Sequence, residues 1–432
     1  LAKIENLYNY VSGNGNHGLD NWLAHGMQDI RSLLSMSMLG SAAITSISDF
    51  GTMYASARVN NIPAFKVFYN QLRAFNPANR AEERLARRAG LMVNTMHNDV
   101  SRFTADTMGP RWSAKLSNAF FRLGSLNAIT EAGRRSFSIA MMDTLGGLTR
   151  DVADPSLLDP ADWRFLRGKG IDQATWDIWR AATPETWGGN HQVLTAESIF
   201  QAPGAWTKIQ RHQAASRLMS VVLEEQNIAV IEPGARERAW TMSVPAGTAS
   251  GEIARSILLF KSFPLAMIKR HLERGIKAYD GMGGKAGYLA KLIALQTVMG
   301  AVAMEVNDVL SGRDPRNLNP FENHGTRNLV TALLKGGALG IYGDFLLGEN
   351  TQYGRTMLET MAGPVAGTIA EFDAATRGNL IQFMAGEETN AGAELTKLAR
   401  SLTPGSNLWY SKAALDHLIF QNLQEYFSPG YL

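Results

Sequence analysis

The sequence predicts an all-α fold, an elongated array of helices, from three observations. Apolar residues recur at intervals of three and four along several long stretches, which is the period of one helix face. Strict alternation of apolar and polar residues, the pattern of a half-buried strand, is almost absent. Valine, which favours strands, is not concentrated in any segment. Helices that each carry one apolar stripe bury it by packing on one another.

The helical period is clearest in four stretches, which are Ala81–Met96, Trp112–Ile129, Glu252–Tyr279 and Leu408–Tyr426. Pro264 interrupts the third stretch, because proline has no backbone N–H to donate within a helix. Asp159 followed by Pro160 predicts a helix start, with the aspartate as the capping residue and the proline at the first helical position. Loops are expected at Gly312–Phe321 and at Thr403–Asn407, which are rich in turn residues.

Composition divides the chain into three expected blocks. Residues 1–150 form a helical, methionine-rich N-terminal block, and residues 151–250 form a helical middle block that is denser in tryptophan and in turn residues. Residues 251–432 form a block of glycine-rich helices, in which glycine allows close helix packing. No exact internal repeat is present.

Charge and cysteine content exclude several classes of protein. The 432 residues carry 42 basic and 39 acidic side chains, so a net charge of +3 gives no general argument for nucleic-acid binding. Cysteine is absent, which excludes a disulfide scaffold, a thiol nucleophile and any metal site built on cysteine. The chain begins with Leu1 rather than methionine and shows no secretory signal pattern, so we expect a piece of a longer protein.

The charge is nevertheless uneven along the chain. Residues 80–150 carry 11 basic and 6 acidic side chains, and residues 251–291 carry 8 and 3. Clustered cations on helices can contact phosphates or acidic partners, although an ordinary solvated helix face has the same appearance. The candidate contacts for DNA or an acidic partner are Arg134, Arg135, Lys269, Arg270 and Arg274.

Neither of the two longest uncharged runs clearly predicts a membrane span. Ser32–Ser48 has 17 residues but many serines, and Leu292–Met304 has 13, whereas a spanning helix needs about 20 mostly apolar residues. Two interpretations remain, namely buried helices of a soluble protein or segments that meet a bilayer in some state. Close helix packing or bilayer contact is most expected in Leu289–Met304 and Gly336–Leu347 and at small-residue pairs four apart. These pairs are Gly283/Gly287, Gly336/Gly340 and Gly363/Gly367.

The sequence predicts no enzyme, cofactor, metal site or catalytic residue. Residues 13–18 match the pattern G-x-G-x-x-G, but neither the preceding strand nor the βαβ unit of a dinucleotide site accompanies them. The eight histidines include no pair three or four residues apart. Glu197-Ser198 resembles the start of a lytic transglycosylase motif, in which the glutamate is a general acid. A helix start with Thr195 as the cap is the better interpretation.

The C-terminal half resembles the C-terminal region of very long bacteriophage internal virion proteins, also called ejection or inner-core proteins. The resemblance rests on ten short motifs in a fixed order over residues 246–432, mostly glycine, proline and aromatic positions. They are Ala246-Gly247-Thr248, Gly251–Arg255, Phe260–Pro264, Gly312–Pro315, Lys335–Leu346, Ala362–Val365, Thr389–Gly392, Thr403–Ser406, Leu408–Tyr410 and Ala414–Asp416. Residues 112–199 resemble the family more loosely, through Arg111-Trp112 and the Gly170–Trp176 stretch.

This resemblance implies a protein packaged inside the capsid, above the portal, that leaves before or with the genome and helps to build a conduit through the host envelope. It implies a homo-oligomer in a ring, with other ejection proteins, the portal and phage DNA as partners. After ejection the host inner membrane or periplasm becomes a further partner. A lytic transglycosylase domain elsewhere in the parent chain is compatible with the family. The alternatives are a membrane-active, pore-forming helical protein and a peptidoglycan hydrolase segment.

Overall fold

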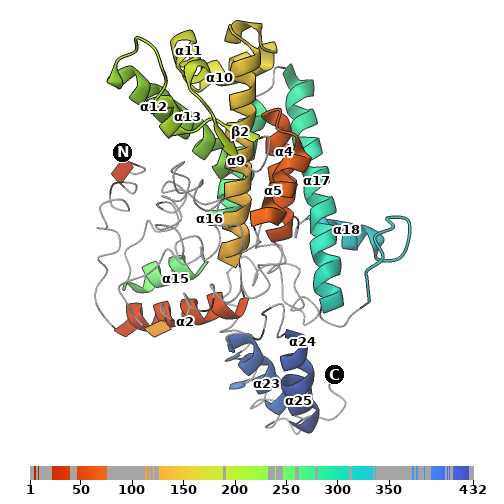
Figure 1. The fold of residues 1–432 in the computed structure, drawn as a ribbon. Coiled ribbons are helices and arrows are strands. Elements are labelled where there is room, and N and C mark those ends of the chain that lie inside the picture. The colour runs from red at the N-terminus through yellow and green to blue at the C-terminus, as the bar shows by residue number, and fades with distance from the viewer. Residues whose placement is uncertain are drawn as a thin grey trace.

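The structure is a computed structural model, and helices account for nearly all of the chain that it describes (Figure 1). The described residues are 22–38, 46–74, 126–187, 191–231, 247–257, 262–277, 281–310, 314–333, 391–403 and 412–427, together with a few isolated positions. The predicted all-α class is confirmed. The predicted stretch at residues 81–96 and most of the one at residues 112–129 lie outside the described residues.

All but the first of the described helices in the first half surround a common interior. The helices of this half are α2 (Trp22–Met38), α4 (Asp49–Val59), α5 (Ala64–Ala74), α9 (Leu126–Asp151), α10 (Pro160–Gly168), α11 (Gln173–Ala181), α12 (Ala196–Phe200) and α13 (Lys208–Ala229), with the 3-10 turns η3 (Ser46–Ser48) and η4 (Pro155–Leu157). Their starts follow local capping chemistry. The Asp159 carboxylate accepts a hydrogen bond from the Ala161 N–H at 2.8 Å, with Pro160 at the first helical position. Thr195 caps α12. Both predicted helix starts are therefore confirmed.

The described helices of the second half include one of exceptional length, α17. They are α15 (Ala249–Ile257), α16 (Ser262–Lys277), α17 (Gly281–Leu310), α18 (Gly325–Leu333), α23 (Ala391–Leu402), α24 (Lys412–Leu415) and α25 (Gln421–Phe427), with the π-helical turn η8 (Asp416–Phe420) between the last two. In the predicted 252–279 stretch, Pro264 does not break the helix that contains it. It lies in the first turn of α16, where a missing N–H costs no hydrogen bond.

A small β-hairpin was not predicted. Strands β1 (Glu185–Trp187) and β2 (His191–Val193) pair antiparallel, with Glu185 opposite Val193. The signal that could have revealed it is Gly188-Gly189 between the two short segments, because paired glycines favour tight hairpin turns. The hairpin is anchored to α9, whose Asp143 carboxylate accepts the Gln192 N–H at 2.9 Å.

One large apolar core unites the first two predicted blocks. It runs from Met53 on α4 to Val230 at the end of α13, and its largest members are Trp176 and Trp179 on α11. Both indole N–H groups donate to backbone carbonyls, those of Val152 at 3.0 Å and Ala214 at 2.9 Å. The boundary expected at residue 150 therefore does not separate two cores. Helix α9 runs through this boundary, and it packs on helices of both expected blocks.

Helix α17 lies along one edge of the fold, with α4 on one side and α18 on the other (Figure 1). Its contact with the segment after α18 is a backbone approach, because a Cβ at Gly300 would collide with the Ala332 carbonyl and with Gly336. On the α4 side, a Cβ at Gly51 would lie 3.2 Å from the Gln296 side chain. Glycine thus sets how closely α17 packs in two places.

We predict that Gly300→Ala destabilises the protein by about 1–3 kcal/mol, because the added methyl meets backbone that cannot rotate away. The matched control is Gly283→Ala on the same helix, where a Cβ meets nothing within 4 Å. Alanine favours a helix over glycine by up to about 1 kcal/mol, so the control is neutral or stabilising. Thermal unfolding of the two variants measures the difference, and equal melting temperatures would contradict the packing described.

Candidate functional site

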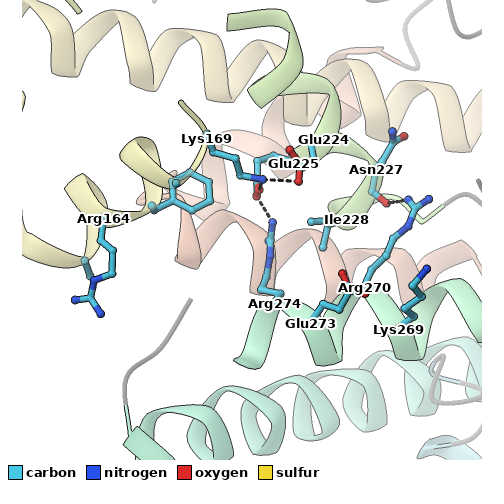
Figure 2. A pocket seen from close by; sticks show the side chains of 13 residues that line it. Arg164, Lys169, Glu224, Glu225, Asn227, Ile228, Lys269, Arg270, Glu273 and Arg274 are labelled. Atoms are coloured by element: carbon cyan, nitrogen blue, oxygen red, sulfur yellow. Dashed lines mark hydrogen bonds and ion pairs between the residues drawn. The ribbon is translucent and has the colours of Figure 1, made fainter. Parts of the chain in front are cut away.

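A pocket of about 510 Å³ lies between α10, α13 and α16 (Figure 2). Its lining is strongly charged, with five cationic side chains against three carboxylates. The cations are Arg164, Lys169, Lys269, Arg270 and Arg274, and the acids are Glu224, Glu225 and Glu273. Three of the five basic residues singled out from the sequence are thus brought together here.

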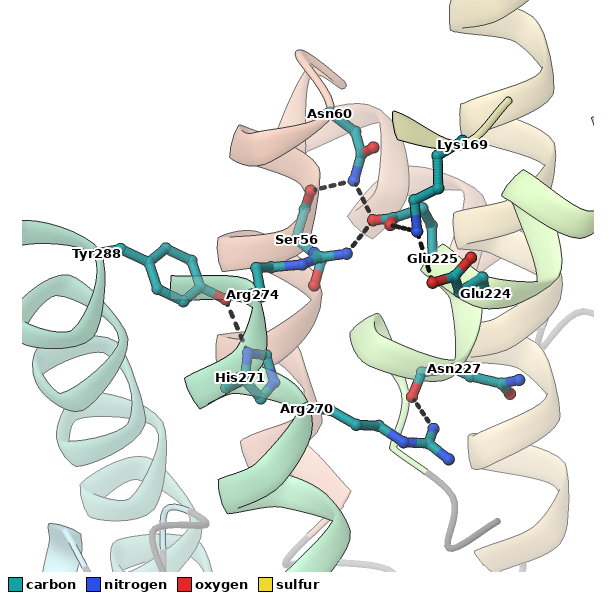
Figure 3. Close-up of polar contacts among 10 residues, drawn as sticks. All are labelled: Ser56, Asn60, Lys169, Glu224, Glu225, Asn227, Arg270, His271, Arg274 and Tyr288. Carbon is teal, nitrogen blue, oxygen red and sulfur yellow. Dashed lines mark hydrogen bonds and ion pairs between the residues drawn. The ribbon is translucent and has the colours of Figure 1, made fainter. Parts of the chain in front are cut away.

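Glu225 is the central residue of the pocket wall (Figure 3). It lies on the inward stripe of α13, in the same row as Leu218, Val222 and Ala229, and its side chain is 1% exposed. Its carboxylate forms an ion pair with Arg274 of α16 and lies 3.3 Å from the Lys169 ammonium after α10. The Asn60 side chain at the end of α4 donates a hydrogen bond to it at 2.8 Å. We call these four residues the Glu225 junction.

The neighbouring acid, Glu224, faces outward and serves a smaller role. Its carboxylate lies 2.6 Å from the Lys169 ammonium, but its side chain is 55% exposed. Lys169 therefore bridges two adjacent glutamates of α13, one in water and one in the interior. A solvent-exposed pair contributes at most about 1 kcal/mol, whereas removal of one member of a buried pair costs several.

The charges of the junction shift the pKa values of its buried groups. Burial acts to raise the pKa of Glu225, but the Arg274 guanidinium and the Lys169 ammonium outweigh it and hold the pKa below its usual value. His271, one turn before Arg274, has its pKa lowered to about 3 by burial and by the charges of Arg274 and Arg270. Its Nδ1 lies 2.8 Å from the Tyr288 hydroxyl of α17. The imidazole is therefore neutral at pH 7.

The structure corrects the expectation for two of the basic residues. Arg274 and Arg134 are buried, so they do not form a solvated face open to DNA. Arg274 is paired with Glu225, and an Arg134 N–H points to the Asn227 side-chain oxygen at 3.5 Å. Arg270 is half-buried and donates to the Asn227 carbonyl at 2.7 Å, close to the end of α13. A cation at that position also complements the helix dipole.

Lys269 and Arg135 are half-buried and retain some access to solvent. Lys269 lines the pocket from α16 (Figure 2), whereas Arg135 lies on α9. The five basic residues therefore do not form one surface. Sequence spacing placed them on helices but could not show which side of each helix turns inward.

The glycine pairs also differ from one another. Gly336 makes the close contact with α17 described above, whereas a Cβ at Gly283 or Gly287 would meet nothing within 4 Å. These two glycines therefore mediate no close packing within the chain, and the alternative of bilayer contact stays a prediction. Gly340, Gly363 and Gly367 lie outside the described residues, as does the rest of the 336–347 segment. The G-x-G-x-x-G segment at 13–18 is likewise outside them.

No metal-binding group of three or more His, Asp or Glu side chains occurs within the described parts of the chain. Glu197 lies at the start of α12, where its carboxylate accepts a hydrogen bond from the exposed Gln201 side chain at 2.5 Å. Thr195 and Ser198 complete the capping box at this helix start. The surroundings of Glu197 are those of a helix N-terminus and not those of an acid held in an apolar cleft.

The second notable feature is the apolar character of α17. Among the described residues it is the helix long and apolar enough to cross a membrane, over Met282–Leu310, yet only 28% of its most apolar 18-residue window is buried. The lengths of the uncharged runs in the sequence underestimate the apolar length of this helix, because Lys291 divides it into two short uncharged runs. With 30 residues, α17 is about 45 Å long.

No protein family, curated protein or solved structure compared with the chain matches it.

We predict that Glu225→Gln lowers the free energy of unfolding by about 3–5 kcal/mol, because Arg274 and Lys169 lose their buried counter-charge. The matched control is Glu224→Gln, one residue away and also paired with Lys169, which should cost less than about 1 kcal/mol. Chemical denaturation of both variants measures this contrast. Similar losses for the two variants would show that the junction does not have the stabilising role assigned to it.

We predict that His271 makes stability depend on pH between 6.5 and about 3. Over this range the unfolded histidine binds a proton while the folded one does not, so the folded state loses stability as the pH falls. Between pH 7 and 4 the loss amounts to about 3 kcal/mol. His271→Gln removes it, so the unfolding free energies of wild type and variant should converge on acidification. Parallel pH profiles of the two proteins would refute the assignment.

Proposed function

We propose that this chain is part of a bacteriophage internal virion protein. In this proposal it lies in the inner core above the portal and, after ejection, contributes to a conduit that delivers the genome across the host envelope. The order of the glycine, proline and aromatic motifs over residues 246–432 supports the family. The helical architecture is compatible with it.

The observation that carries the conduit role is the exposed apolar surface of α17. Ile293 and Val298, from the uncharged part of the helix, are 51% and 54% exposed. A helix that is apolar on nearly every side is normally buried in a protein core or in a bilayer. Here the chain itself buries only one side of it. A bilayer offers cover to the remainder, and its hydrocarbon core of about 30 Å is shorter than the helix.

Helix α16 supports the same role through the direction of its side chains. Arg274, one of its charged residues, points into the protein and is paired there, while several apolar side chains of the same helix point outward. The exposed ones are Ile268, Leu272 and Ile276. In water an amphipathic helix shows the opposite arrangement, whereas ionisable residues in membrane proteins face the interior and pair with one another.

The proposal includes the partners and location implied by the family. The chain would assemble as a homo-oligomer in a ring, beside other ejection proteins and the portal, and near phage DNA. After ejection it would meet the host inner membrane or periplasm. Of the five basic residues, Arg135, Lys269 and Arg270 are half-buried and keep the solvent access that a contact to DNA phosphates requires.

A membrane-active, pore-forming protein of other origin is the second candidate, because the exposed surface of α17 favours it equally. The two candidates differ in location, since only the first requires the chain inside a capsid. No observation at Glu197 favours a peptidoglycan hydrolase.

We predict that Ile293→Cys, labelled with an environment-sensitive fluorophore, shows a blue-shifted and stronger emission when vesicles are added. The chain has no cysteine, so the label reports one site alone. Vesicles of phosphatidylethanolamine and phosphatidylglycerol provide the bilayer. The shift is expected because the Ile293 side chain is 51% exposed and would enter hydrocarbon.

The matched control is Leu157→Cys, an aliphatic position in η4 that is even more exposed, at 76%, and far from α17 in the sequence. Its emission should not change. No shift at either position would contradict the conduit role, and equal shifts at both would indicate general adsorption instead of insertion by α17.

A further inference from the structure

The outward side of α17 has an order that its apolar character alone does not explain. Six of its residues follow the alternating four- and three-residue spacing of a helix–helix seam, and all six are exposed or half-buried. They are Gly287, Lys291, Ala294, Val298, Ala301 and Glu305. Leu292, Gln296 and Gly300, which pack inside the chain, lie on the opposite side of the helix. We call the six residues the α17 seam.

The seam residues are mostly small, which would let a second helix approach closely. Small residues alone do not identify an occupant. The two charged members of the seam are more informative. Lys291 and Glu305 are of opposite sign, and each lies seven residues from Val298, on either side of it.

This placement is self-complementary in one orientation only. If two copies of α17 pack antiparallel around a twofold axis at Val298, Lys291 of each copy lies opposite Glu305 of the other. Parallel packing would instead bring lysine against lysine and glutamate against glutamate, which is repulsive. Antiparallel packing also sets the two helix dipoles in opposite directions.

Hydrogen bonds within the chain fix the position of the Glu305 carboxylate. Its two carboxylate oxygens each lie 3.2 Å from the Arg316 backbone N–H, which donates to them from the loop after α17. The same loop contributes the Arg316 guanidinium, which binds the buried Asp308 one turn further on at 2.6 and 3.0 Å. A carboxylate has about four acceptor sites, so Glu305 can also receive a lysine ammonium.

We propose that the α17 seam is a homodimer interface, in which α17 packs antiparallel on α17 of a second copy around a twofold axis at Val298. The interface covers the exposed apolar surface while the protein is in water. It is independent of the conduit proposal, since it needs no membrane, and a bilayer is the competing occupant of the same surface.

Single-cysteine crosslinking in vesicle-free buffer tests the interface, because the chain has no cysteine of its own. Only a residue on the twofold axis meets its own copy. Val298→Cys should therefore form a disulfide-linked dimer under mild oxidation at least tenfold faster than the matched control Ile293→Cys. Ile293 is as exposed as Val298 but lies about 140° around the helix.

Charge reversal tests the orientation in the Val298→Cys background. Lys291→Glu alone and Glu305→Lys alone should each slow the crosslinking about tenfold or more, through like-charge contact across the axis. The double variant should restore it. Helical circular dichroism confirms that each variant is folded.

Three outcomes would overturn the proposal. Equal crosslinking at positions 293 and 298 would mean random collision, and failure of the double variant to recover would exclude the antiparallel register. Crosslinking at position 298 only after vesicles are added would assign the surface to lipid. That last result would leave the conduit proposal intact. Efficient crosslinking at Val298 without any vesicle response at Ile293 would instead support the homodimer and contradict the conduit role.

Discussion

The ion pair between Glu225 and Arg274, completed by Lys169 and Asn60, is the constraint on which the arrangement of the helices depends. It joins four segments that are distant in the sequence at one buried point: the ends of α4 and α10, the last turn but one of α13, and the last turn of α16. Buried charges of this kind add little free energy beyond what apolar residues would give. An arrangement of the helices that leaves one of these charges buried without its partner costs several kcal/mol, about 3–5. We infer that the junction specifies how α16 docks more than it strengthens the fold.

The way in which α16 docks determines which of its side chains are exposed at the surface of the protein. Because Arg274 and His271 are turned inward, the apolar side of α16 is turned outward, and α17 follows it along the edge of the fold (Figure 1). In the second half the charged Arg274 is buried while α16 and α17 expose much apolar surface, whereas the first half buries Trp176 and Trp179 in its core. This contrast is what the proposals for the bilayer and for a second copy both explain.

Sequence reasoning succeeded where local chemistry decides the structure. Helical periodicity gave the fold class, and Asp159-Pro160 and Thr195 gave helix starts, because a cap depends on residues a few positions away. It failed where the outcome depends on distant partners. Arg274 was expected at a surface because its ion-pair partner, Glu225, lies 49 residues away in the sequence. Glu225 is the one charged residue in an otherwise apolar row of α13. The exposure of α17 could not be foreseen either, since pattern shows that a helix is apolar but not what covers it.

The most direct test of the account is cryo-electron microscopy of the intact virus particle, reconstructed around the portal vertex without imposed icosahedral symmetry. Helical density is expected above the portal, and copies of this chain should fit into it. A capsid interior without such density would contradict the assignment to the inner core. Mass spectrometry of the same particles shows whether they contain the chain elsewhere or lack it.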